Sequence, residues 1–153
     1  MRIEIAQAHE MGTVLTLVEE LLAELGDEGR EFANVDREKL DADIERNLQS
    51  ARFLALLARD ESGSPVGVLT LSMSFALYAG GEYGVIDEMY VKPEHRCRGV
   101  GRALVDEAVV VARQKRWPRL DVTGPESVRG ERAVRFYEKL GFEHTGPKLR
   151  RLV

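Results

Sequence analysis

The sequence predicts an α/β protein in which one mixed sheet carries helices on both faces. Apolar residues at helical spacing and shorter apolar or alternating runs succeed one another along the chain. Their order is strand, helix, helix, three strands, helix, strand, helix, and one or two terminal strands. The 153 residues are enough for one well-buried core and too few for two ordinary domains. We therefore expect a single domain over residues 1–153.

The N-terminal third is predicted to hold one strand and two helices. Polar and apolar side chains alternate over Arg2–Ala6, which is typical of a strand. Apolar residues recur at helical spacing over Met11–Leu25, and Gly26 stops that pattern. Asp36 can cap a second helix that ends near Gln49. One apolar stripe follows this second helix: Leu40, Ile44 and Leu48.

Three strands are predicted in the middle of the chain. Phe53–Arg59 is the first, and the turn-forming residues Asp60–Ser64 connect it to a long strand over Val66–Leu77. The segment Ala79–Gly81 then turns the chain into the strand Tyr83–Val91. The residue types of Asp60–Ser64 are those of a hairpin turn.

The C-terminal part is predicted to alternate helices and strands. A helix over Gly99–Lys115 is followed by a buried strand at Leu120–Thr123. The last helix spans about Gly130–Leu140, and Gly141 ends it. Two terminal strands complete the prediction: Phe142–His144 and Leu149–Leu152.

Composition excludes several classes of protein. No apolar run is long enough to cross a bilayer, and the N-terminus lacks the apolar region of a signal peptide. The single cysteine, Cys97, excludes an intrachain disulfide and a cysteine-rich metal site. The three histidines are scattered without metal-ligand spacing. We expect a cytoplasmic protein with no membrane association and no metal.

Charge is distributed unevenly along the chain. The first 50 residues hold 13 acidic and 5 basic side chains, whereas the remainder holds 13 acidic and 17 basic ones. The basic excess of the second part suits a polyanionic ligand. Nucleic acid is a poor candidate, because the net charge is −4 and no aromatic residues interleave with the basic cluster.

The most informative segment is Arg96–Leu104, which reads RCRGVGRAL between a strand and a helix. The first turn of a helix leaves backbone N–H groups without intrahelical partners, and the helix dipole is positive there. Gly99 and Gly101 let an anion approach these groups closely. Three cations surround the same point: Arg96, Arg98 and Arg102. The pattern predicts a diphosphate site, and it matches neither a dinucleotide fingerprint nor a P-loop.

Arg96-x-x-Gly99-x-Gly101 resembles the signature Arg/Gln-x-x-Gly-x-Gly/Ala of the GCN5-related N-acetyltransferases, the GNAT superfamily. The preceding Met89–Glu94 is similar to that family's lead-in, and Ala133–Phe142 (AVRFYEKLGF) is similar to its C-terminal motif. The resemblance covers nearly the whole chain and is weakest in the N-terminal third. It implies a mostly antiparallel central sheet and acetyl-CoA as the co-substrate.

The resemblance also implies roles for the segments around the signature. The loop and helix start would hold the pyrophosphate through a set of residues: Arg96, Cys97, Arg98, Gly99, Val100, Gly101 and Arg102. The strand that ends at Met89, Tyr90 and Val91 would carry a bulge and splay from its neighbour, and its exposed backbone groups would pair with the pantetheine arm. A plain core strand is the alternative for this strand end, and a simple turn residue is the alternative for Cys97.

Three side chains are candidates for catalysis. Asp87 and Glu88 are neighbours on the strand, so they point to opposite faces unless a bulge intervenes. One of them, with Glu88 slightly favoured, would take the proton of the amine; the alternative is a pair of solvated edge residues. By the resemblance, Tyr137 would protonate the leaving thiolate, and otherwise it is a packed helix tyrosine. The family often has asparagine where this chain has Gly130, so that cofactor contact is not assigned.

The resemblance predicts direct acetyl transfer to a primary amine. A small cationic amine is favoured because the N-terminal helices would wall the acceptor side and carry nine acids: Glu19, Glu20, Glu24, Asp27, Glu28, Glu31, Asp36, Asp41 and Asp43. A solvated helix face is the alternative explanation of these acids. A protein or peptide N-acetyltransferase and a silent acyl-CoA-binding domain stay open, and the oligomeric state is undetermined, with a homodimer as one candidate.

Overall fold

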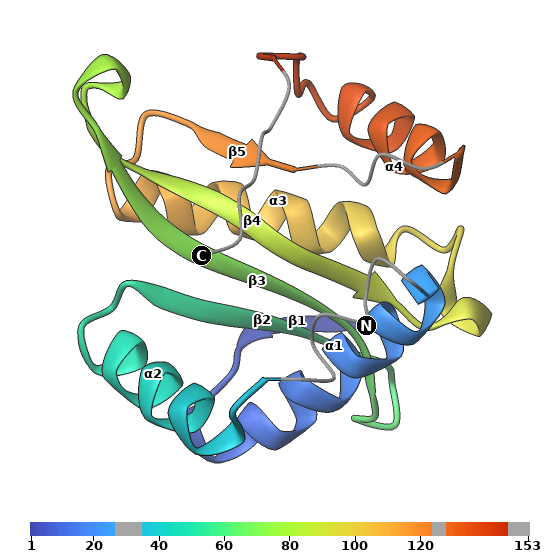
Figure 1. Cartoon of the computed structure of the whole chain (residues 1–153). Helices are drawn as coiled ribbons and strands as arrows, with labels where there is room; N and C mark the ends of the chain where they lie inside the picture. The colour runs from blue at the N-terminus through green and yellow to red at the C-terminus, as the bar shows by residue number, and fades with distance from the viewer. Residues whose placement is uncertain (27–34, 124–127, 147–153) are drawn as a thin grey trace.

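The computed structural model describes residues 1–26, 35–123 and 128–146 (Figure 1). Five strands form one sheet in the order β1-β2-β3-β4-β5. The first four pair antiparallel, and β5 pairs parallel with β4. The strand bounds are β1 Arg2–Ile5, β2 Phe53–Arg59, β3 Pro65–Ala76, β4 Gly81–Val91 and β5 Leu120–Val122.

Helices cover both faces of this sheet (Figure 1). Helices α1 and α2 pack on one face, while α3 and α4 pack on the other. The α-helix bounds are α1 Met11–Leu25, α2 Arg37–Gln49, α3 Val100–Gln114 and α4 Val128–Glu138. Single 3-10 turns occur at η1 Ala8–Glu10, η3 Leu77–Ala79 and η4 Pro93–His95. No helix in these described ranges is long and apolar enough to cross a membrane.

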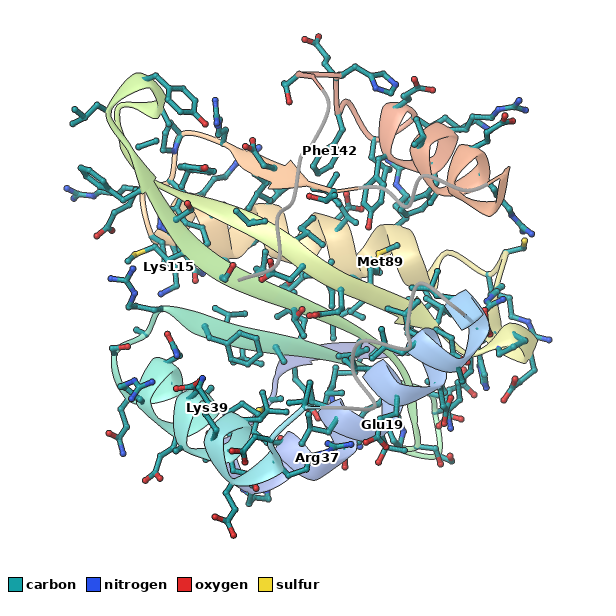
Figure 2. All side chains as sticks on the ribbon, in the orientation of Figure 1. Glu19, Arg37, Lys39, Met89, Lys115 and Phe142 are labelled. Carbon is teal, nitrogen blue, oxygen red and sulfur yellow. The ribbon has the colours of Figure 1, made fainter. Side chains whose placement is uncertain are left out.

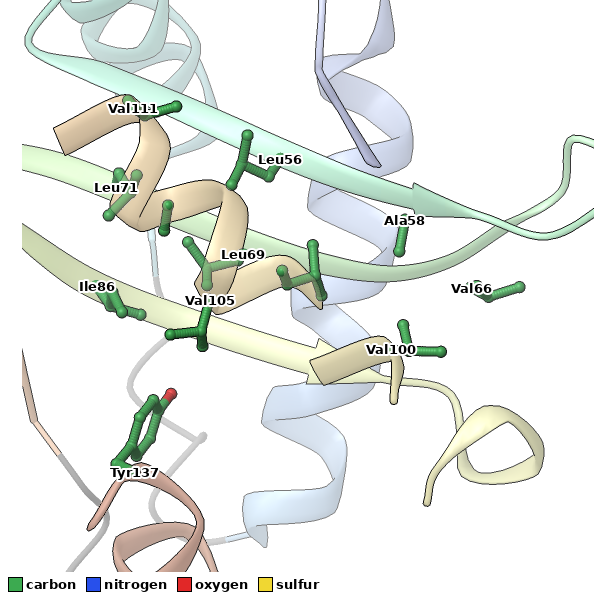
Figure 3. Packing of buried hydrophobic residues seen from close by; sticks show 12 residues of the cluster. Leu56, Ala58, Val66, Leu69, Leu71, Ile86, Val100, Val105, Val111 and Tyr137 are labelled. Carbon is green, nitrogen blue, oxygen red and sulfur yellow. The ribbon is translucent and has the colours of Figure 1, made fainter. Parts of the chain in front are cut away.

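The core divides into two clusters because alternate side chains of each strand point to opposite faces. On the α3 side, Leu69 and Leu71 of β3 are fully buried in one cluster with Val105 of α3 (Figure 3). On the α1 side, Val68 of β3 is fully buried in a second cluster that includes Leu17 of α1. The sheet thus separates an α1 side from an α3 side. The candidate site lies on β4, which contributes side chains to both clusters.

Most predicted elements are observed within two residues of their expected bounds. The strand Phe53–Arg59 is confirmed at both ends. Asp36 caps α2, because its carboxylate accepts a hydrogen bond from the Lys39 backbone N–H at 3.1 Å. Gly26, with φ 64°, ends α1.

The prediction of a strand at Phe142–His144 is wrong. The backbone N–H of Phe142 donates to the Tyr137 carbonyl at 3.1 Å, and the two rings meet edge to face at 5.3 Å. The chain therefore folds back onto the end of α4 instead of joining the sheet. The other terminal strand, predicted at Leu149–Leu152, lies outside the described residues.

Candidate active site

Strand β4 carries a bulge opposite the middle of β3. The register between the two strands shifts between Leu69 and Leu71, so that Asp87 and Glu88 together oppose Thr70. A bulge of this kind inserts one extra residue, which bends the strand and increases its local twist. The bulge predicted for this strand is confirmed, and it lies at the two candidate acids.

The bulge also decides which face each β4 side chain occupies. Ile86 and Met89 both contact the cluster on the α3 side, although regular alternation would place residues three apart on opposite faces. The extra residue reverses the alternation, and Tyr90 joins the cluster on the α1 side. Glu88 contacts Thr70, which lies between two α3-facing residues of β3 and so also faces α1. Asp87 is exposed.

The Glu88 carboxyl is largely buried and has one hydroxyl partner. Its Oε2 accepts a hydrogen bond from Thr70 Oγ1, and its backbone N–H donates to the same oxygen at 3.0 Å. Burial raises the pKa of Glu88, and the nearby Asp87 charge raises it further, while the Thr70 hydrogen bond lowers it. The net effect is a carboxyl whose pKa lies above its ordinary value, as suits a base that works near neutral pH.

Beyond Ile86, β4 and β5 no longer pair in the described part of the chain. Their ladder covers Gly84–Ile86 of β4, and β5 ends at Val122 (Figure 1). Farther along β4, the backbone N–H groups of Glu88 and Lys92 point to β3, where Lys92 donates to a carbonyl at 2.9 Å. Because successive residues of a strand alternate between its two edges, the backbone groups of Met89 and Val91 point to the β5 side.

The loop after β4 leads directly into the first turn of α3. Gly99 caps this helix with φ 84°, and Cys97 also has a positive φ of 58°. The first backbone bond of α3 joins the Ala103 N–H to the Gly99 carbonyl at 3.0 Å. The preceding N–H groups of that turn therefore have no helical acceptor. A Cβ added at Gly99 would meet nothing within 4 Å, so its surroundings are open.

The three arginines of the signature have different surroundings. Arg96 points back across β4: its Nε donates to the Val91 carbonyl at 2.7 Å, and its Nη2 meets Glu24 of α1 at 2.7 Å. Its guanidinium also lies 5.5 Å from the centre of the Tyr90 ring. Arg98 is exposed. The exposed Arg102, which follows Gly99 and Val100 into the helix, pairs loosely with Asp106 at 3.5 Å. Arg96 therefore joins the loop to α1, while the other two remain at the surface.

The second glycine of the signature, Gly101, faces α4 and β4. A Cβ at Gly101 would lie 3.4 Å from the Phe136 ring of α4 and 3.9 Å from the Met89 methyl group. Both distances are ordinary van der Waals contacts, so a methyl group would fit at this position. Val100, next to it, is buried in the core on the α3 side.

Tyr137 extends from α4 toward β4. Its hydroxyl lies 3.8 Å from the Met89 sulfur, and Figure 3 shows the phenol directed at the sheet. Burial raises the pKa of Tyr137 to about 12, so the phenol keeps its proton at all physiological pH values. Glu88 and Tyr137 therefore approach the same segment of β4 from opposite sides.

The acidic residues of α1 and α2 mostly have cationic partners. Arg37 at the start of α2 contacts Glu19 of α1 at 2.5 Å (Figure 2). Glu20 lies 4.0 Å from Lys92, and Glu24 bonds Arg96 as described above. Asp43 pairs with two cations of its own helix, and Asp36 caps that helix. Three of the nine acids, at positions 27, 28 and 31, lie outside the described residues. The described acids therefore form ion pairs more than an open acidic wall.

Sequence reasoning missed two residues that the structure places at the site. In the sequence, nothing distinguishes Thr70 from any other strand threonine. Only the register of β3 against β4 reveals its contact with Glu88. In the sequence Glu24 is only one of several acids on a helix face, yet its carboxylate accepts a hydrogen bond from Arg96 and lies 3.3 Å from the Tyr90 hydroxyl. No group of three possible metal ligands occurs among the described residues.

The chain belongs to the acetyltransferase (GNAT) family, whose model matches residues 16–142. An uncharacterized N-acetyltransferase of Methanocaldococcus jannaschii is 34% identical over 100 residues, which are 60% of this chain and 43% of that protein. The peptidyl-lysine N-acetyltransferase YjaB of Escherichia coli is 36% identical over 90 residues, which are 59% of this chain and 50% of YjaB. The chain thus spans about half the length of these curated relatives.

Solved structures share the fold over the whole chain. An aminoglycoside acetyltransferase from an uncultured soil metagenomic sample matches with a TM-score of 0.80 at 22% identity, covering 100% of this chain and 99% of that one. A ribosomal-protein-alanine N-acetyltransferase from Brucella melitensis biovar Abortus matches with a TM-score of 0.73 at 22% identity, covering 99% and 100%. The predicted mixed, mostly antiparallel sheet is therefore confirmed.

Proposed function

We propose that this protein is an acetyl-CoA-dependent N-acetyltransferase that transfers the acetyl group directly to a primary amine. The observation that carries the proposal is the geometry of β4. Its bulged part carries the largely buried Glu88, its edge at Met89 and Val91 has no strand partner in the described part of the chain, and the loop that follows it leads to the first turn of α3. Membership of the GNAT family supports the same reaction class.

The residues present fit the co-substrate. The open space at Gly99 and the N–H groups at the start of α3 suit a diphosphate. The exposed Arg98 and Arg102 add charge at the rim. The edge of β4 suits an extended amide-containing arm, which can bond to a strand edge as another strand would. Arg96 would contribute indirectly, by fixing the position of the loop, because its guanidinium already donates to the Val91 carbonyl and to Glu24.

Acetyl-CoA supplies a thioester whose carbonyl carbon is attacked by the amine. On this chain, the Met89 and Val91 N–H groups are the backbone donors aimed at the open edge, so one of them is the candidate to polarise the thioester oxygen. The Val91 carbonyl already accepts a hydrogen bond from Arg96 at 2.7 Å. At Val91 the candidate group for the thioester oxygen is therefore the backbone N–H.

Glu88 is the proposed base. An alkyl ammonium has a reference pKa of about 10, so a proton must be removed before the nitrogen can attack. The Glu88 carboxylate, with its raised pKa, would accept that proton at Oε1 or through a water while Oε2 stays bonded to Thr70. Asp87, exposed beside it, would help to attract the ammonium group.

Tyr137 is the proposed acid. Its hydroxyl lies against Met89, on the side of β4 opposite Glu88. Because its pKa is about 12, the phenol is fully protonated and can donate to a developing thiolate. The amine and the leaving sulfur would thus be served by different groups on the two sides of the strand.

For the acceptor, we propose a small cationic amine. The support comes from the two adjacent carboxyls Asp87 and Glu88, which lie together at the bulge of β4. A peptidyl lysine is the second candidate, because the relative YjaB carries that activity in its name. Both candidates present a primary ammonium group.

The test is the release of free thiol from acetyl-CoA over a panel of acceptors. Spermidine, an aminoglycoside, a lysine peptide and a peptide with a free N-terminus would be compared at equal concentration. Turnover fastest with the small polyamines supports the proposal, and a preference for lysine peptides supports the second candidate. Tight acetyl-CoA binding without turnover on any amine, under conditions where a known acetyltransferase is active, would indicate a silent binding domain.

A further inference from the structure

Thr70 has only 1% of its surface exposed. Apart from aromatic residues, no other polar side chain within residues 1–26, 35–123 and the described part of 128–146 is fully buried. Thr70 lies in the middle of β3, between Leu69 and Leu71, both fully buried on the α3 side. Its own side chain faces the α1 side, opposite the bulge of β4. A buried hydroxyl must form hydrogen bonds to offset the loss of water, and both of its bonds go to one residue.

That residue is Glu88. Thr70 Oγ1 accepts the Glu88 backbone N–H at 3.0 Å and donates its proton to Glu88 Oε2. A bulge takes one backbone group out of the regular ladder, and the hydroxyl supplies a substitute partner for it. Thr70 thereby fixes two things at once: the backbone at the bulge and the direction of the carboxyl.

We propose that Thr70 is a positioning residue, which holds the Glu88 carboxylate in place at the bulge and keeps it ionised at working pH. The inference rests on the proposed role of Glu88 as the base. A hydroxyl has a single proton, and donating it to a carboxylate favours the ionised form over the neutral acid. This opposes burial and the Asp87 charge, which both raise the pKa of Glu88.

Other ionisable groups lie around this part of β4 and must be kept constant in a test. On β4 itself it is Asp87, and from α4 it is Tyr137. From α1 come Glu20 and Glu24, which act on the neighbouring Tyr90 and pair with Lys92 and Arg96. None of these groups needs to be altered to remove the Thr70 hydroxyl.

The experiment compares Thr70→Val, which keeps the shape and removes the hydroxyl, with Thr70→Ser, which keeps the hydroxyl. The Glu88 pKa is measured in each protein without substrate by carbon NMR of the carboxyl, assigned by the signal lost in Glu88→Gln. We expect a pKa about half a unit or more higher in Thr70→Val, because a favourable bond to the charged form is lost. Thr70→Ser should remain close to the unaltered protein.

Kinetics give the second readout. Since the base must be ionised, the acidic limb of the kcat/KM profile should move to higher pH in Thr70→Val and stay in place in Thr70→Ser. The KM for acetyl-CoA should change little. If Thr70→Val does not fold, Thr70→Cys replaces it, since a thiol is a weaker donor of similar size.

The two failures can be told apart. An unshifted Glu88 pKa in folded Thr70→Val, or an equal shift in Thr70→Ser, would overturn the role of Thr70. A shifted Glu88 pKa together with full activity of Glu88→Gln would leave the Thr70–Glu88 coupling standing while removing Glu88 as the base. A loss of thermal stability without a pKa shift would assign Thr70 a purely structural role.

Discussion

The two halves of β4 differ in side-chain packing and in strand pairing. In the first half, Gly84 pairs with β3 on one edge and with β5 on the other, and a Cβ there would lie 2.5 Å from Leu120 and 2.6 Å from the Trp117 ring. The second half has a bulge, a buried carboxyl and a free edge. One half is closed by packing, and the other is left open by the lack of a neighbour in the described chain.

This difference indicates how one strand can be both scaffold and site. Backbone hydrogen bonds on both edges hold the first half of β4 in the sheet. The second half can therefore separate from β5 while the strand stays folded. The open half has polar groups where β-strands are ordinarily depleted in them. Substitutions in the first half should therefore affect stability, and those in the second half should affect turnover.

The largest effect is expected in the open half, at Glu88→Gln. Removing the base should lower kcat by about 10²- to 10⁴-fold, the range for general base catalysis. The acidic limb of the pH profile, set by the raised pKa of Glu88, should disappear with it. Steady-state rates from pH 5 to 10 provide the measurement. Asp87→Asn is the matched control, and a greater loss there would make Asp87 the base.

The next effect is expected at Tyr137→Phe. Loss of the acid should reduce kcat by roughly 10²-fold with little change in the KM for acetyl-CoA, because the phenol is proposed to act on the leaving group. The ring contacts with Phe136 and Phe142 are kept by phenylalanine. A rate equal to that of the unaltered protein would make Tyr137 a packing residue only.

A smaller effect is expected at the loop, in Gly99→Asp compared with Gly99→Asn. Both side chains tolerate the positive φ of 84° and enter open space, so their difference is one negative charge. Repulsion of a diphosphate should weaken acetyl-CoA binding by about 10- to 100-fold for the aspartate relative to the asparagine. Calorimetric titration measures this ratio, and equal affinities would place the diphosphate elsewhere.

The smallest effect on turnover is expected in the closed half, at Gly84→Ala. The added methyl group would overlap Trp117 and Leu120, so the free energy of unfolding should fall by about 1–3 kcal/mol. That corresponds to a drop in Tm of very roughly 2–12 °C for a domain of this size, while kcat at 25 °C stays within a few-fold. Thermal melts with Gly12→Ala as control test this, since Gly12 is helical with open surroundings and should gain stability. A stable but inactive Gly84→Ala would contradict the division of the strand.

Local patterns in the sequence were sufficient to predict most of the fold. The spacing of apolar residues placed four helices and five strands, and Asp36 and Gly26 marked helix ends correctly. The strand predicted at Phe142–His144 failed because its apolar ring packs on Tyr137 instead of on the sheet. A short apolar run shows that a side chain is buried, but not against which partner.

The candidate site could be predicted only in part. The loop and helix start of Arg96–Leu104 have a local signal, since glycines and cations adjoin one another in sequence. The Thr70–Glu88 contact spans 18 positions and the Arg96–Glu24 contact spans 72, so both depend on strand register and helix docking. A bulge that shifts the alternation by one residue leaves no mark in the periodicity, and it places Glu88 on the α1 side beside Thr70.

The short ladder between β4 and β5 has a consequence for the C-terminal part of the chain. Only three residue pairs, Gly84–Ile86 with Leu120–Val122, join β5 to the described sheet, and α4 with Tyr137 follows β5. Segments held by few bonds open more readily than the central strands, and they exchange amide hydrogens faster. A molecule bound along the part of β4 that does not pair with β5, and in contact with α4, would hold β4 and α4 together. Amide exchange in β5 and α4 should therefore slow on addition of acetyl-CoA, while the amides of β2 and β3 change little.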